Sequence, residues 1–183
     1  MYILLVYILK KTMKIKGFTL IEVLVVVAII GILAAIGVIQ FSGFTESAKA
    51  KVVQTQHTNL VKFMTAEFAK CQFNPNGGFG IKYDPHGSGP AAATQIPGTG
   101  MIDCKTINTE RMGYVFESYF NNEAKFKNPY SNDLAGVNYS GGPGSTLGTI
   151  NFSLSGKTFR VISAWRDESS QTKTLISTVT DER

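Results

Sequence analysis

The sequence predicts an α+β fold in which a long N-terminal α-helix packs on a small antiparallel β-sheet. Three observations predict it. No Asp, Glu, Lys, Arg or His occurs between Val23 and Thr45. Beyond that run, apolar residues at helical spacing continue as far as Cys71. The C-terminal part then holds three segments rich in β-branched residues, which are typical of strands.

The uncharged run is long enough to cross a membrane, because a helix needs about 20 apolar residues to span a hydrocarbon core of roughly 30 Å. Glu22 stands at its start, and a carboxylate beside an apolar span is costly unless a positive charge pairs with it. The positive-inside tendency places this end of the helix in the cytoplasm. The lysines that produce this tendency are Lys10, Lys11, Lys14 and Lys16.

The second half of the expected helix is amphipathic. Spacings of three, four and seven residues place one apolar stripe on the face that would pack against the head: Val53, Leu60, Met64, Phe68 and Cys71. Charged residues fall on other faces, where we expect solvent to reach them: Lys51, Lys62, Glu67 and Lys70. The first half, which is apolar all round, should instead pack against lipid or against sister helices.

The start of the helix carries a specific pattern, Lys16-Gly17-Phe18-Thr19-Leu20-Ile21-Glu22-Val23, followed by apolar residues to Ile36. This stretch resembles the leader and N-terminal helix of bacterial type IV pilins. The resemblance implies cleavage between Gly17 and Phe18 by a prepilin peptidase, and N-methylation of Phe18. It also implies that Glu22 is the filament-assembly carboxylate, pairing with the Phe18 ammonium of a neighbouring copy.

The resemblance further implies a pilin-like architecture and a structural function. The chain would be the major pilin of a type IV pilus, serving adhesion, twitching motility or DNA uptake. Before assembly it would cross the inner membrane once with its N-terminus in the cytoplasm. The pilus assembly machinery would then polymerise it into an extracellular helical filament, a homo-oligomer. Whether that filament contacts a surface, DNA or another cell is left open.

Two other readings stay open at this point. A pseudopilin of a type II secretion system, or a minor pilin, would share the same leader and helix. A membrane-anchored extracytoplasmic binding module would share the anchor alone. The family usually has a proline where Ile39 stands, so Gly37 is the expected flexible point, unless the small residues serve close helix packing.

The expected organisation has four parts: a leader over residues 1–17, with Met13 as a candidate start; a long helix over 18–71, with the transmembrane or filament-core part up to about 44; a Gly/Pro-rich helix-to-sheet loop over 72–105; and a globular head over 106–183. In the head, the pattern predicts a short helix over Thr109–Asn122. Three antiparallel strands follow, over Leu147–Leu154, Thr158–Trp165 and Lys173–Thr180.

Cys71 and Cys104 are the two cysteines of a chain whose head is expected outside the cytoplasm, so they predict a disulfide. Closing that loop should stabilise the fold by about 3 to 4 kcal/mol. The net charge of +5 lies mostly in the leader, because four of the 18 Lys and Arg residues precede Phe18. A general nucleic-acid-binding protein is therefore not expected.

The sequence predicts no enzyme, no cofactor and no metal site. It contains no Ser-His-acid arrangement with supporting residues and no HExxH motif. His57 and His86 are isolated, and we expect both to be solvated. Asn128, Asn132 and Asp133 offer oxygen ligands for calcium, but with a single carboxylate. Asn138 and Asn151 fit a glycosylation pattern that often arises by chance.

Overall fold

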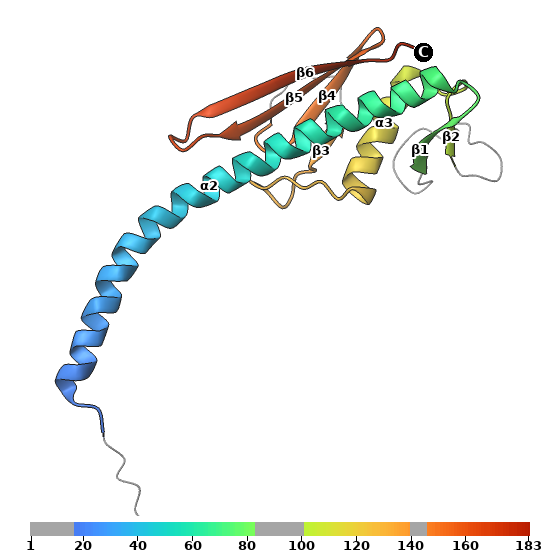
Figure 1. Ribbon diagram of the computed structural model, residues 1–183. Coiled ribbons are helices and arrows are strands. Elements are labelled where there is room, and N and C mark those ends of the chain that lie inside the picture. The colour runs from blue at the N-terminus through green and yellow to red at the C-terminus, as the bar shows by residue number, and fades with distance from the viewer. Residues whose placement is uncertain (1–16, 83–100, 140–145) are drawn as a thin grey trace, which may run out of the picture. The chain divides into compact units, whose positions relative to one another are not determined.

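The computed structural model describes residues 17–82, 101–139 and 146–183. The chain divides into two compact units, Met1–Ser42 and Gly43–Arg183. The described elements are, in chain order, α2 (Leu20–Phe73), β1 (Gly78–Lys82), β2 (Met101–Asp103), α3 (Thr109–Ser118), the π-helical turn η1 (Tyr119–Glu123), β3 (Val137–Tyr139), β4 (Ile150–Ser155), β5 (Thr158–Arg166) and β6 (Thr172–Thr180). The structure is therefore an α+β arrangement of the pilin-like type, with α2 contributing to both units (Figure 1).

In the first unit, α2 contains one stretch, Leu20–Gly37, that is long and apolar enough to cross a membrane. None of this stretch is buried within the structure. Gly31 and Gly37 do not interrupt the helix, and a Cβ added at either would meet nothing within 4 Å. The expected flexible point at Gly37 is thus a regular part of α2, with open space around it.

In the second unit, four strands form one sheet in the order β3-β4-β5-β6. The β4-β5-β6 meander is antiparallel, as the sequence predicts, whereas β3 joins β4 in parallel and was not predicted. The prediction of a three-stranded sheet is therefore wrong in one respect, because the sheet has a fourth strand, β3. Three β-branched runs can be recognised by composition, but Val137–Tyr139 is too short to have a period.

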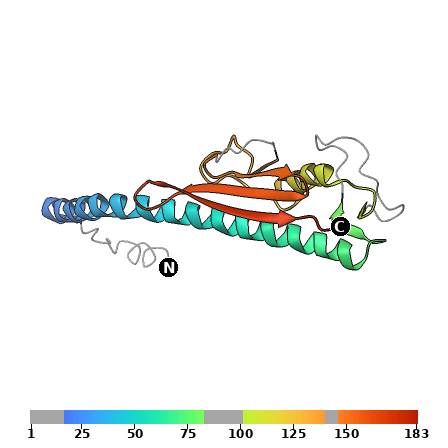
Figure 2. The ribbon, with the colours of Figure 1, turned by 90° about the horizontal axis from the view of Figure 1, so that it is seen from above.

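The second half of α2 lies along one face of this sheet (Figure 1, Figure 2). The predicted apolar stripe points into the core, where Val53, Leu60 and Met64 are fully buried. Phe68 stacks on Phe159 of β5, with ring centroids 5.9 Å apart. Burial of the stripe against the sheet holds the helix and sheet together, because each buried side chain of this size contributes about 1.5 to 3 kcal/mol.

Two polar residues of α2 are buried, contrary to the expectation that solvent reaches them. His57 is 1% exposed and Glu67 is 2% exposed. The Glu67 carboxylate accepts the backbone N–H of Gly80 at 2.7 Å and pairs with Lys70. The helical spacing placed Glu67 near the edge of the core-facing stripe, and the strand that covers it comes from a segment expected to be irregular.

That segment is the Gly/Pro-rich stretch over 72–105, which was expected to be a helix-to-sheet loop and which contains two short strands. β1 and β2 pair in an antiparallel sheet, with Phe79 opposite Ile102, and both side chains are fully buried. Residues 83–100, which include His86, lie outside the described part. Cys71 and Cys104 form a disulfide with their Cα atoms 5.5 Å apart, which joins the end of α2 to β2.

The short predicted helix is present as α3 continued by η1. Asn108 caps α3, because its side-chain oxygen accepts the backbone N–H of Arg111 at 2.8 Å. One face of this helix points into the core, with Met112, Val115, Phe116 and Phe120 buried. Phe63 of α2 stacks on Tyr119 at 4.6 Å, so α3 and η1 pack beside α2.

Candidate assembly site

The first residue of α2 and the residues just before it are exposed. Gly17 is exposed, and a Cβ added to it would meet nothing within 4 Å. Phe18 is 80% exposed and Leu20 is 83% exposed. A peptide bond between Gly17 and Phe18 is therefore sterically accessible to another protein, and no contact with the described residues requires glycine at position 17.

Thr19 and Glu22 form a reciprocal cap at the start of α2. The Thr19 hydroxyl accepts the Glu22 backbone N–H at 3.4 Å, and the Glu22 carboxylate accepts the Thr19 backbone N–H at 3.3 Å. The Thr19 hydroxyl also donates to that carboxylate at 3.2 Å. This is a capping box, in which the side chains at the cap and three residues later satisfy backbone donors that the helix leaves free.

Glu22 has no cationic partner among the residues that the structure describes, because its carboxylate bonds only to Thr19. A capping box supplies hydrogen bonds but leaves the negative charge uncompensated. A helix N-terminus favours that charge modestly, by about 0.3 to 1 kcal/mol at exposed positions. In an apolar setting a carboxylate requires more than this, so the geometry leaves room for a positive charge from another molecule.

Sequence reasoning identified Gly17, Phe18 and Glu22 but did not assign a role to Thr19. The signal for that role is present in the sequence, because Thr19-Leu20-Ile21-Glu22 has the Thr-x-x-Glu spacing of a capping box. The structure brings Thr19 and Glu22 into contact.

His57 is a buried polar residue of the second unit, and both of its ring nitrogens have a hydrogen-bond partner. His57 lies between two strands: its Nδ1 is 2.9 Å from the Ser163 Oγ on β5, and its Nε2 is 2.9 Å from the Ser177 Oγ on β6. Burial lowers the pKa of His57 below its ordinary value, which favours the neutral ring. His57 is therefore a bridge between α2 and the sheet.

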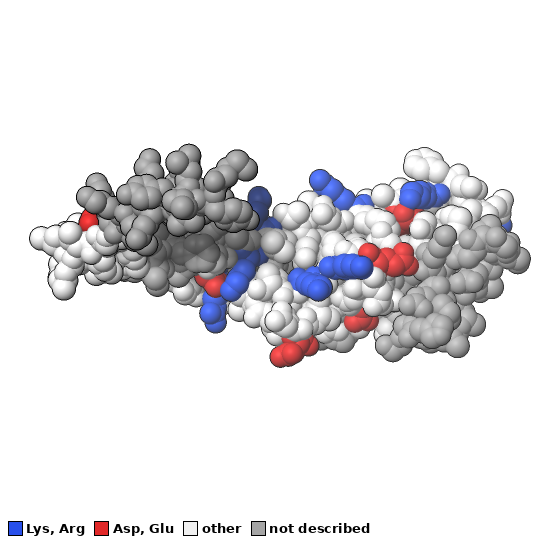
Figure 3. Space-filling view, turned by 90° about the horizontal axis from the view of Figure 1, so that it is seen from below, with Lys and Arg blue, Asp and Glu red and all other residues white. Residues whose placement is uncertain are grey.

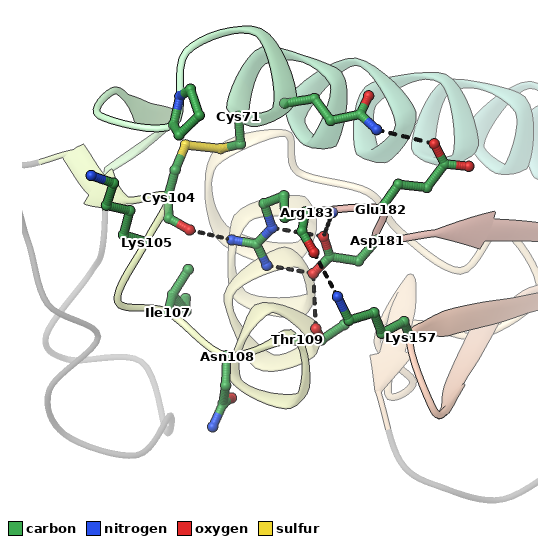
Figure 4. Close-up of a pocket in the computed structure, with 12 residues that line it drawn as sticks. Cys71, Cys104, Lys105, Ile107, Asn108, Thr109, Lys157, Asp181, Glu182 and Arg183 are labelled. Carbon is green, nitrogen blue, oxygen red and sulfur yellow. Dashed lines mark hydrogen bonds and ion pairs between the residues drawn. A yellow bond between two sulfur atoms is a disulfide. The ribbon is translucent and has the colours of Figure 1, made fainter.

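Asp181 and Arg183 lie beside the Cys71–Cys104 disulfide at one end of the head (Figure 4). The Arg183 guanidinium donates to the Asp181 carboxylate and, at 2.7 Å, to the Cys104 carbonyl oxygen. Burial opposes ionisation of Asp181, but hydrogen bonds from Arg183 and Thr109 outweigh it and hold the pKa of Asp181 below its ordinary value. The guanidinium also lies 5.0 Å from the ring centroid of Phe79.

A pocket of about 530 Å³ opens beside this cluster. Its polar walls bond to one another, because Arg183 pairs with Asp181 and Gln72 donates to Glu182 at 3.0 Å. Lys157 donates to the Arg183 carbonyl oxygen. These contacts tie the C-terminal side of β6 to α2 and to the β4-β5 turn, which is a structural function.

The loop considered for calcium uses its side-chain oxygen internally. Asn128 is buried, and its Oδ1 accepts the backbone N–H groups of Tyr130 at 2.8 Å and of Ser131 at 3.2 Å. Its amide nitrogen donates to the Leu147 carbonyl at 2.8 Å. Asn128 therefore organises the loop, and the described part of the chain holds no group of three or more His, Cys, Asp or Glu side chains arranged for a metal.

Comparison with known proteins identifies one feature of the chain. Residues 12–38 match the family model of the prokaryotic N-terminal methylation motif. The match spans the residues just before Gly17, the Gly17–Phe18 bond, the capping box and the apolar stretch Leu20–Gly37. No curated protein and no solved structure matches the chain. The chain thus carries the N-terminal methylation motif, which supports a precursor of the type IV pilin-like or pseudopilin kind.

Proposed function

We propose that this protein is a structural subunit, the major pilin, of a type IV pilus. The observation that carries the proposal is the Glu22 carboxylate, which stands at the start of an apolar helix inside a matched methylation motif and has no cation beside it in the described residues. The apolar stretch Leu20–Gly37 holds the precursor in the inner membrane.

In the proposed reaction sequence, a prepilin peptidase hydrolyses the Gly17–Phe18 bond, and the new Phe18 amine is then methylated. The methylated amine stays positively charged and pairs with Glu22 of a neighbouring copy. Pairing restores charge balance where each group alone would be costly, and it fixes the register between subunits. Each copy offers one group to one neighbour and one to another, so the contact is heterologous and generates an open filament.

Replacement of Glu22 tests the proposal. Glu22→Ala should leave processing and membrane insertion intact, because neither the Gly17–Phe18 bond nor the apolar stretch is altered. Filaments should be lost, as seen by electron microscopy of material sheared from cells. Thr65→Ala is a matched control, since Thr65 is exposed on α2 in the second unit. Abundant normal filaments from the Glu22→Ala chain would overturn the pairing.

A pseudopilin or minor pilin would carry the same motif, and abundance separates it from a major pilin. A major pilin should form the main protein band of sheared surface filaments, identified by mass spectrometry. A minor component would instead be present in trace amounts beside another pilin. The dominant band is the result that the proposal expects.

A further inference from the structure

A polar groove runs along one side of the second half of α2, between this helix and the end of the β5-β6 hairpin. It consists of two adjoining hollows of about 620 and 360 Å³, which share Lys51, Gln54 and Trp165 as lining residues. We call the larger hollow the basic groove, and its remaining walls are Thr55, Thr58, Asn59, Lys62 and Leu175.

The chemistry of the basic groove favours an acidic partner. Lys51 and Lys62 are exposed, and neither forms an ion pair with a described residue. No acidic side chain lines the larger hollow. Trp165 is half-buried there and is the single tryptophan of the chain. Two unpaired cations beside an aromatic ring match a surface that presents carboxylates around an aromatic or apolar group.

Such a surface exists on the same molecule. Glu110, Tyr114 and Glu117 occupy positions i, i+4 and i+7 of α3, so they share one helix face, which we call the acidic ridge. Glu110 and Tyr114 are exposed, and Tyr114 is held edge-on against Tyr139 with centroids 4.8 Å apart. Burial raises the pKa of Glu117, although a hydrogen bond from the Tyr139 backbone opposes this. A nearby cation would therefore stabilise the ionised carboxylate.

The acidic ridge and the basic groove lie on opposite sides of the second unit. Helix α3 packs against β3 and β4, and the strand order places β6 at the other edge of the sheet. Figure 3, seen from below, shows acidic and basic side chains interspersed on that face of the molecule. One copy therefore cannot fill its own groove with its own ridge, whereas two neighbouring copies can meet groove to ridge.

The basic groove and the acidic ridge also lie at different positions along the axis of α2. Helix α3 and η1 contact α2 at Phe63 and Phe68, and the groove extends from Lys51 to Lys62. The centres differ by roughly ten residues, which is about 15 Å at 1.5 Å per residue. A groove-to-ridge contact between parallel copies is accordingly staggered along the helix axis, which gives an open helical assembly and not a closed ring.

We propose that the basic groove of one copy receives the acidic ridge of the next copy in the filament. Lys62 faces Glu110 and Lys51 faces Glu117, and Tyr114 lies against Trp165. This inference rests on the proposed function, because it names the partner of the head in the same filament that Phe18 and Glu22 assemble.

Cysteine cross-linking tests the contact directly. Both native cysteines are already paired, so introduced thiols report only the new contact. A chain carrying both Thr58→Cys and Tyr114→Cys should form a ladder of dimers, trimers and larger species when its filaments are oxidised and separated without reductant. Either substitution alone should give monomers. Monomers alone from intact filaments of the double variant, or a ladder that stops at dimers, would overturn the proposal.

Charge exchange provides a second measurement that does not depend on disulfide geometry. Lys62→Glu should reduce filament yield on the order of tenfold, because it places like charges across the contact. Adding Glu110→Lys to that chain should restore most of the yield. Lys105→Glu, which makes the same charge change at an exposed site away from the groove, should have no effect. Normal yield from Lys62→Glu, or no restoration in the pair, would contradict the contact.

Trp165 fluorescence tests the groove-to-ridge contact independently of the proposed filament function. It also tests whether another ligand binds in the basic groove. Acrylamide should quench Trp165 several-fold less in filaments than in detergent-solubilised monomers. Filaments with equal quenching would overturn the groove-to-ridge contact and leave the filament function in place. Failure of the unmodified chain to form filaments would overturn both. Protection of the monomer by single-stranded DNA, without protection on assembly, would assign the groove to nucleic acid instead.

Discussion

The apolar side chains of α2 are exposed in the first half of the helix, whereas its apolar stripe is buried in the second half. Between Leu20 and Gly37 none of the helix is buried, whereas Val53, Leu60 and Met64 in the second half are fully buried. Both halves are continuous helix, so local structure does not make the difference. The second half meets a sheet from its own chain. The first half has no such cover in the described chain and is suited to lipid or to other copies.

The polar side chains of the two units also differ, in where their hydrogen-bond partners come from. In the second unit, His57, Glu67 and Asp181 are buried and each has hydrogen-bond partners from distant parts of the chain. Among the described residues of the first unit, the Glu22 carboxylate bonds only to its neighbour Thr19. These three polar residues of the head thus find their partners by folding, whereas Glu22 has no cationic partner in the described part of the chain.

Matched truncations in the two halves should give the largest contrast. Phe68→Ala should lower the free energy of unfolding of the head by about 3 to 5 kcal/mol, because Phe68 is buried among Phe79, Phe116 and Phe159. Leu33→Ala should leave that free energy unchanged, since Leu33 is 64% exposed. Denaturant unfolding of the detergent-solubilised chain measures both. An equal loss in the two variants would show that the halves are not independent.

Removing the disulfide should also destabilise the head without affecting the first unit, by slightly less than Phe68→Ala does. A chain with Cys71→Ala and Cys104→Ala should lose about 3 to 4 kcal/mol of head stability, because the unfolded chain regains the freedom of the closed loop. The helical signal of the first unit should not change. Chemical denaturation followed by circular dichroism measures the loss, and treatment of the unmodified chain with reductant should reproduce it.

Acidification should destabilise the head through His57. Burial lowers the pKa of His57 below its ordinary value of 6.5, so the unfolded chain takes up the proton at a higher pH than the folded chain. The stabilising contribution is therefore complete above about pH 6.5 and is lost as the pH falls through the lower folded pKa. Thermal unfolding across this window should show the decline. His57→Gln, which keeps a donor and an acceptor but does not titrate, should flatten the profile.

The smallest expected effect is at the helix start. Thr19→Ala removes the cap and should destabilise the first turn of α2 by about 1 kcal/mol. Faster hydrogen exchange at the Glu22 backbone N–H in detergent micelles would report it. Thr19→Ser keeps the hydroxyl and should restore slow exchange. Head stability should be the same in all three chains, and a change there would break the division between the units.

The sequence allowed much of the architecture to be predicted because long periodic segments report their environment directly. The apolar stripe from Val53 to Phe68 and the β4-β5-β6 meander were found from spacing and composition. β1, β2 and β3 were missed, since strands of three to five residues among glycines have no measurable period. Their existence depends on partners distant in sequence.

Some of the polar residues described above could likewise be recognised from the sequence, and others could not. Glu22 is recognisable from sequence because one carboxylate beside an uncharged run is exceptional, and Thr19 is recognisable from the capping spacing. His57 was expected to be solvated, although it falls four residues after Val53 and three before Leu60, in line with the apolar stripe of an amphipathic helix. The cover comes from Ser163 and Ser177, more than a hundred residues away.

By itself, the sequence determined the N-terminal feature: an apolar helix long enough for a membrane, with Gly17, Phe18 and Glu22 at its start. These properties are local, since hydropathy, charge and capping depend on adjacent residues. Tertiary structure alone decided which polar residues are buried, where β3 joins the sheet, and that Lys51, Lys62 and Trp165 line one groove opposite the Glu110 ridge. Such groupings arise because folding brings distant segments together, and local periodicity carries no record of those distances.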